Sequence, residues 1–171
     1  QLAPVQEVRR LQHGGDGRLE AVLERGLAGE DGVVGAHARV GQRLASSVDA
    51  PFVDTDVRIV ERYGPIDQIF EREGEEFFRI IEREVVADVC AAPDPLVIAS
   101  GGGAIVDPDN RRRFRAAGVV VWLRAPTAVL AARVGDGATR PLLAGDPAGA
   151  LARLGAARQD AYESSADAVV E

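Results

Sequence analysis

Two acidic residues follow a short apolar segment in Phe52-Val-Asp-Thr-Asp56. One carboxylate of such a pair can orient a metal ion, while the other accepts the proton of a hydroxyl group. A second interpretation is structural, with Asp56 as the N-cap of a following helix. Taken alone, the residue types support both interpretations equally.

Three glycines, Gly101, Gly102 and Gly103, directly follow the apolar segment Leu96-Val-Ile-Ala99. Glycine lets the backbone approach a ligand closely because no side chain intervenes. A flexible loop is the alternative, and the position straight after a strand favours the close approach. The spacing of individual arginines gives no such signal, since a lone arginine is usually solvated or paired.

The elements that must position these residues alternate between strands and helices. Strands are predicted at 51–54, 96–99, 119–123 and from 168 onward. Helices are predicted at 39–48, 57–63, 66–71, 73–90, from 108, from 126, and at 148–162. This alternation predicts an α/β fold in which a parallel sheet is flanked by helices and ligands bind at the carboxyl ends of the strands.

Two segments carry more specific expectations. Residues 1–34 show no clear strand, and short helices are predicted at 6–11 and 19–25. The helix at 73–90 has an apolar pattern, and its predicted inward face is Phe77, Ile80, Ile81, Glu84, Val85 and Val89.

Composition excludes several classes of protein. The net charge of −7 argues against a nucleic-acid interface in this domain, and no segment is apolar over the roughly 20 residues that a membrane helix needs. The single cysteine, Cys90, excludes an internal disulfide, so a cytoplasmic location is expected. The chain has no methionine, which leaves room for a further domain upstream of Gln1.

Taken together, the motifs resemble the shikimate kinase family from Pro51 to Glu171. In chain order they are Phe52-Val-Asp-Thr-Asp56, Gly74-Glu-Glu-Phe-Phe-Arg79, Ala99-Ser-Gly-Gly-Gly-Ala104, Arg140-Pro-Leu-Leu143 and the pair Arg158 and Tyr162. The resemblance implies a three-layer, P-loop kinase-like fold with a parallel sheet. It places the kinase-like domain at 35–171, with a lid at about 135–146, after a poorly defined segment at 1–34.

The resemblance also implies an activity, the transfer of the γ-phosphoryl group of ATP to the 3-hydroxyl of shikimate with Mg²⁺. Asp56 would bind the shikimate hydroxyls and act as base, and Asp54 would hold Mg²⁺ through water. Arg79 and Arg158 would bind the carboxylate of shikimate or a similar hydroxy acid, and Gly101–Gly103 would line it.

On the nucleotide side, the resemblance implies roles for two more arginines. Arg140 would be the lid residue that reaches phosphate and substrate on closure, and Arg133 would lie along adenine.

The phosphate-binding loop departs from the family pattern. A loop of the form G-x-x-x-x-G-K-[ST] wraps phosphates with its amides, places lysine on the phosphates and a hydroxyl on Mg²⁺. Counting back from Asp54 places this loop at residues 31–38. There Asp31 stands for the first glycine, Ala36 for the second, His37 for the lysine and Ala38 for the hydroxyl residue, while Gly35 keeps part of the loop-to-helix pattern.

No lysine elsewhere in the chain could replace the missing one, because all 20 residues counted as Lys or Arg are arginine. Losing several preorganised donors together predicts very low kinase activity. Three explanations stay open. Residues 1–38 could be a damaged, misread or rebuilt part of an ordinary kinase, the protein could be a non-catalytic ligand-binding or regulatory domain, or its nucleotide site could be unconventional.

Overall fold

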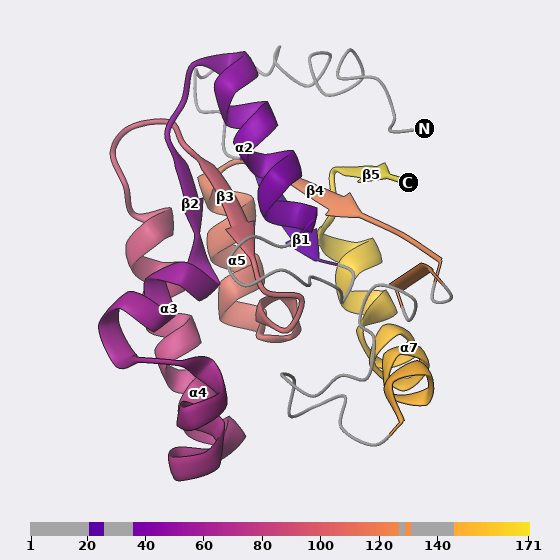
Figure 1. The fold of residues 1–171 in the computed structure, drawn as a ribbon. Coiled ribbons are helices and arrows are strands. Elements are labelled where there is room, and N and C mark those ends of the chain that lie inside the picture. The colour runs from indigo at the N-terminus through magenta and orange to yellow at the C-terminus, as the bar shows by residue number, and fades with distance from the viewer. Residues whose placement is uncertain (1–20, 26–35, 127–128, 131–145) are drawn as a thin grey trace.

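The structure, a computed structural model, describes residues 21–25, 36–126, 129–130 and 146–171. Within these residues the strands form one parallel sheet in the order β2, β3, β1, β4, β5 (Figure 1). They are β1 (Ala21–Arg25), β2 (Phe52–Asp54), β3 (Val97–Ser100), β4 (Val119–Leu123) and β5 (Ala168–Val170). The predicted α/β class with a parallel sheet is confirmed.

The central strand β1 corrects the prediction for residues 1–34. It pairs in parallel with β3 on one side and β4 on the other, so that Leu23 lies opposite both Ala99 and Val121. The predictions of a helix at 19–25 and of no strand before residue 35 are therefore wrong. Ala, Leu, Glu and Arg are all strong helix formers, but pairing on two sides satisfies the backbone groups and overrides that local preference.

The helices match the predicted series closely. They are α2 (Ala36–Val48), α3 (Thr55–Tyr63), α4 (Ile66–Cys90), the short 3₁₀ helix η2 (Ala104–Val106), α5 (Pro108–Ala117) and α7 (Pro147–Ser165). Leu130 also has a helical backbone, and its amide donates to the Pro126 carbonyl, as expected for a helix that begins there. None of the helices in the described part of the chain has both the length and the apolar character to cross a membrane.

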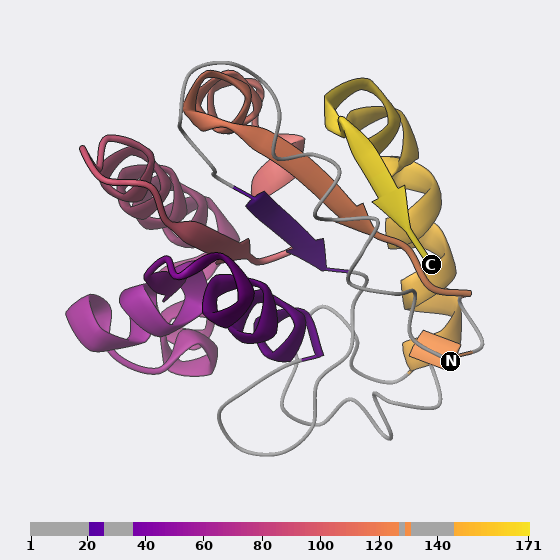
Figure 2. The ribbon, with the colours of Figure 1, turned by 90° about the horizontal axis from the view of Figure 1, so that it is seen from above.

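The helices form two layers on opposite faces of the sheet (Figure 2). Successive residues of a strand point to opposite faces. In β3, Val97 packs in the cluster that contains Ala45 of α2, whereas Ile98 packs with Val85 of α4. The three layers are thus α2, the sheet, and the helices α4, α5 and α7.

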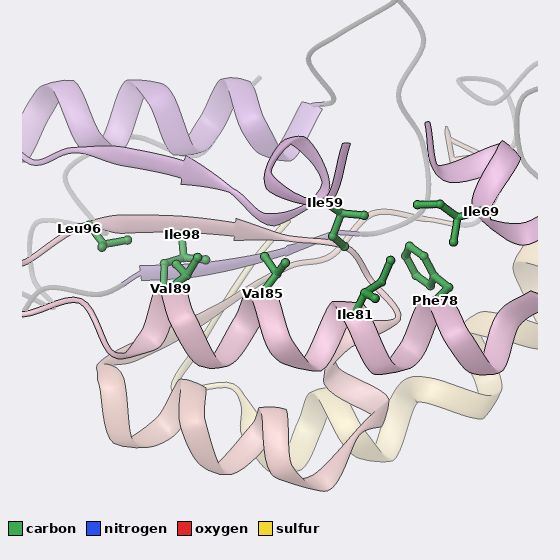
Figure 3. Close-up of a cluster of buried hydrophobic side chains, with 8 residues drawn as sticks. All are labelled: Ile59, Ile69, Phe78, Ile81, Val85, Val89, Leu96 and Ile98. Atoms are coloured by element: carbon green, nitrogen blue, oxygen red, sulfur yellow. The ribbon is translucent and has the colours of Figure 1, made fainter. Parts of the chain in front are cut away.

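The longest helix, α4, lies along the sheet with a row of buried apolar residues (Figure 3). Ile81, Val85 and Val89 are buried as predicted, but Phe77 and Ile80 are 39% and 48% exposed, and Glu84 is exposed as well. The inward face also includes Phe78, Glu82 and Val86. The predicted face was wrong by a small rotation, and the buried glutamate of this helix is Glu82, which is paired with Arg79, and not Glu84.

We expect amide hydrogen exchange to distinguish the central strand from an edge strand. The amides of Val22 to Glu24 in β1, which has partners on both sides, should exchange at least about 100-fold more slowly than that of Val169 in the edge strand β5. The measurement is exchange followed by NMR on the full chain. Equal rates at the two strands would contradict the central position of β1.

Candidate functional site

The acidic pair and the triple glycine meet at the carboxyl edge of the sheet. Asp54 at the end of β2 lies opposite Ala99 of β3, and Gly101 follows two residues later. A Cβ atom built on Gly101 would lie 2.8 Å from Oδ1 of Asp56, closer than real Cβ contacts allow. Glycine is therefore required for the carboxylate of Asp56 to lie against this turn.

The guanidinium of Arg79 lies against the same turn, because a Cβ atom on Gly103 would overlap Nη1 of Arg79. A break in α4 helps to direct this side chain. Gly74 has a non-helical backbone with φ of 82°, which favours glycine, and the helix restarts at Glu75 with Arg79 one turn further on. The predicted pair of helices therefore exists, with the break at Gly74.

Two acids hold the Arg79 side chain, which is 26% exposed. Nη1 donates to Oε2 of Glu82 at 2.8 Å, and Nη2 and Nε donate to Oε1 of Glu75 at 2.9 and 3.3 Å. The guanidinium carbon also lies 5.2 Å from the centre of the Phe78 ring. Its orientation is therefore fixed before any ligand arrives.

Arg158, from α7, is the second arginine of the cluster and is only 6% exposed. Burial lowers the pKa of Arg158, and the positive charge of Arg79 lowers it further, while Tyr162 and Glu82 raise it. The pKa effects of Arg79 and Glu82 on Arg158 show that the three groups are electrostatic neighbours. The positive charge of Arg79 beside that of the buried Arg158 favours an anionic ligand at this cluster.

Glu82 belongs to this cluster but was missed in the sequence. Burial raises the pKa of Glu82 from 4.5 to about 7, the nearby Arg79 opposes that shift, and the carboxylate of Asp56 adds to it. The sequence feature that could have identified Glu82 is its position three residues after Arg79, on the same helix face and next to the apolar residues Ile81 and Val85. A charged residue that lies among apolar residues needs a partner of opposite charge.

The described part of the phosphate-loop segment lies in the first turn of α2. His37 is 5% exposed, and its Nε2 lies 3.5 Å from Oδ2 of Asp54, while neither ring nitrogen has a hydrogen-bond partner among the described residues. Ala38 is 2% exposed. The side chain at the lysine position thus lies inside the protein beside a carboxylate.

The role predicted for Asp54 was to hold Mg²⁺ through water. Its Oδ1 accepts hydrogen bonds from the amides of Asp56 and Val57 at 2.9 and 3.3 Å, so Asp54, and not Asp56, is the N-cap of α3. In the part of the chain that the structure describes, no group of three or more His, Cys, Asp or Glu residues could hold a metal. Ala38 lacks the hydroxyl that the phosphate-loop pattern places on Mg²⁺, so Asp54 would have to act without that partner.

The predicted acceptor-site residues Asp56, Arg79, Gly101–Gly103 and Arg158 are all described. Asp56 and Arg79 lie against the glycine turn, and Arg158 is an electrostatic neighbour of Arg79 and Glu82. The remaining predicted nucleotide-side positions fall outside the described residues. They are Asp31, Gly35, Arg133, Arg140 and the lid at 135–146 except for its last residue. Their roles stay predictions.

Comparison with known proteins gives one consistent family. A family model for shikimate kinase matches residues 37–171. A shikimate kinase of Dechloromonas aromatica is 42% identical over 143 residues, which cover 82% of this chain and 78% of that protein. One of Paramagnetospirillum magneticum is 44% identical over 143 residues, covering 82% and 72%.

Solved structures agree with these relatives. Shikimate kinase from Acinetobacter baumannii in complex with shikimate superposes with a TM-score of 0.80 at 32% identity, covering 90% of this chain and 83% of that one. Shikimate kinase from Aquifex aeolicus superposes with a TM-score of 0.73 at 30% identity, covering 90% and 86%.

The raised pKa of Glu82 predicts a pH-dependent stability. In the unfolded chain this carboxyl has a pKa near 4.5. Between about pH 4.5 and pH 7 the folded protein therefore binds a proton at Glu82 that the unfolded chain does not bind. The stability that protonated Glu82 contributes is complete below about pH 4.5 and is lost as the pH rises through about 7.

We therefore expect wild type to lose on the order of 2 kcal/mol of unfolding free energy, relative to Glu82→Gln, between about pH 5 and pH 8. Urea unfolding at several pH values measures this difference. Glu76→Gln, at an exposed position of the same helix, controls for the loss of one carboxylate. A difference that stays constant with pH would contradict the raised pKa.

Proposed function

The chain belongs to the shikimate kinase family, and we propose that it binds shikimate at the turn Gly101–Gly103 while transferring phosphate from ATP far more slowly than an intact phosphate loop would allow. The observation that carries this proposal is the contrast between two sets of residues. Asp56 and Arg79 lie against one glycine turn, with Arg158 as a charged neighbour, whereas the described phosphate-loop positions hold a buried histidine and an alanine.

Shikimate has one carboxylate and several hydroxyl groups, which matches the charges of the acceptor side. Arg79 and Arg158 offer guanidinium donors to the carboxylate, a pairing that gives strong, charge-assisted hydrogen bonds. Asp56, whose carboxylate lies against Gly101, would accept hydrogen bonds from ligand hydroxyls and take up a proton. The glycine backbone leaves room for a ring beside it.

The donor side lacks the groups that phosphoryl transfer needs. ATP with Mg²⁺ would supply the phosphoryl group and the charge that stabilises it, and the protein would normally add a lysine and a hydroxyl. His37 is buried beside Asp54, and Ala38 has no oxygen to offer. Arg140 and Arg133 are proposed to reach phosphate and adenine, but neither replaces the missing hydroxyl.

A ligand-sensing role without turnover is the second candidate, and the same loss of lysine and hydroxyl favours it. The two candidates differ in one measurement, ADP release in a coupled assay with shikimate and millimolar ATP. Slow but shikimate-dependent release supports a weak kinase. Shikimate binding with no release above background supports a sensor, such as the regulatory part of a longer protein.

We expect shikimate to bind without ATP, because the two sets of residues are separate. Arg79→Ala or Arg158→Ala should each weaken binding about tenfold or more, since each removes charge-assisted hydrogen bonds worth about 1.5–3 kcal/mol. Titration calorimetry with shikimate alone measures this. Arg83→Ala, one turn beyond Arg79 on α4 and 43% exposed, should leave affinity unchanged.

Rebuilding the loop gives the complementary test of the donor side. A variant with Asp31→Gly, Ala36→Gly, His37→Lys and Ala38→Ser should raise shikimate-dependent ADP release by about 100-fold or more, because it restores the phosphate amides, the lysine and the Mg²⁺ hydroxyl together. His37→Lys alone should not, since its ammonium would be buried beside Asp54 and Ala38 would still lack a hydroxyl.

Binding of ATP and Mg²⁺ checks the same interpretation directly. If wild type binds ATP as tightly as the rebuilt variant, the loop is not broken and the donor half of the proposal fails. Adding Asp56→Asn to the rebuilt variant is the control, because it should remove the gained turnover without removing ATP binding.

A further inference from the structure

Tyr162 connects the helix that carries Arg158 to the glycine turn. Its side chain is 6% exposed, and its hydroxyl donates to the carbonyl oxygen of Gly102 at 2.9 Å, across 60 positions of sequence. Arg158 lies four residues earlier on α7, so both side chains project from the same face of that helix. The helix also packs on the residues that follow the turn, because Ala104 and Ile105 lie in the same buried cluster as Tyr162.

The other backbone carbonyls of the turn and of η2 accept hydrogen bonds from residues close in sequence. Gly101 and Gly103 accept from the amides of Ala104 and Val106 at 2.9 and 3.1 Å. The carbonyl of Ala104 accepts from the Asn110 side chain, and those of Ile105 and Val106 accept from Arg111. These local bonds fix the shape of the turn, but they do not fix its distance from α7.

A stacked ring holds Tyr162 in place. Trp122 of β4 lies parallel to it, with ring centres 4.9 Å apart and an angle of 3° between the planes. Tyr162 also packs in a buried cluster with Val86 and Phe114. The hydroxyl therefore occupies a fixed position relative to the sheet.

Three side chains thus contact the glycine turn. Asp56 and Arg79 lie against Gly101 and Gly103, and the Tyr162 hydroxyl donates to the carbonyl of Gly102. We infer that Tyr162 is a positioning residue, which sets the distance between Arg158 and the turn so that both arginines reach one ligand carboxylate. This inference rests on the proposed binding of shikimate, and it adds a residue to which no ligand contact is assigned.

The test removes only the hydroxyl. Tyr162→Phe should weaken shikimate binding about tenfold in calorimetry on the full chain, because the buried Gly102 carbonyl loses its donor and α7 is no longer tied to the turn. Tyr63→Phe is the matched control, since it removes a hydroxyl that donates to Glu84 at 2.8 Å on the exposed surface. Its affinity for shikimate should stay within about twofold of wild type.

A second measurement separates positioning from a general loss of rigidity. If Tyr162 acts through Arg158, then adding Tyr162→Phe to Arg158→Ala should weaken binding by less than about twofold further. A full further tenfold loss in the double variant would show independent effects and would overturn the inference. Unchanged affinity of Tyr162→Phe would overturn it as well.

Two remaining outcomes are also decisive. If wild type does not bind shikimate, the proposed function and this inference both fail, whereas wild-type binding with an unaffected Tyr162→Phe variant sinks the inference alone. If thermal unfolding shows that Tyr162→Phe does not fold, Trp122→Leu keeps the hydroxyl but removes the stacked ring. It should weaken binding about threefold, and unchanged affinity there would overturn the inference.

Discussion

Asp56 and Arg79 approach the same turn because it has no side chain at Gly101 or Gly103. The two glycines are two residues apart, and the carboxylate of Asp56 and the guanidinium of Arg79 each lie against one of them. The backbone hydrogen bonds of the turn fix the distance between the two glycines. The elements on either side of this contact fit the same arrangement. The buried strand β3 leads directly into the turn, and α4 has its break at Gly74, five residues before Arg79.

The two arginines of this site differ in how fully nearby carboxylates compensate their charge. Glu75 and Glu82 compensate Arg79 directly, but burial lowers the pKa of Arg158 and no carboxylate lies within ion-pair distance of it among the described residues. A buried cation without full compensation is costly, and the arrangement favours an anionic ligand that supplies the missing charge. The raised pKa of Glu82 has the same origin, because its carboxylate is buried near that of Asp56.

The sequence predicted the parts of this site that rest on local signals. The strand ending at Asp54, the strand before the glycines and the helix breaks at Gly64 and Pro65 all depend on short-range patterns, and their existence was predictable. Strand β1 was not, because four of the five residues of Ala21–Arg25 also favour helices and only pairing with two distant strands decides its conformation. Glu82 was missed for a related reason, since its burial depends on Arg79 and on a fold that hides that face of α4.

The two halves of the family's site depend on different features of the chain. Strand β1 contributes backbone pairing to the centre of the sheet, and many sequences can supply that pairing because the hydrogen bonds come from the main chain. Phosphate binding instead requires particular side chains at the start of α2, where this chain has His37 and Ala38. The acceptor side depends on β2, β3, α4 and α7, none of which needs a lysine in the phosphate loop to fold. The sheet can therefore keep its central strand and its glycine turn whichever side chains stand at the start of α2, because the fold constrains the backbone of that segment and the reaction constrains its side chains.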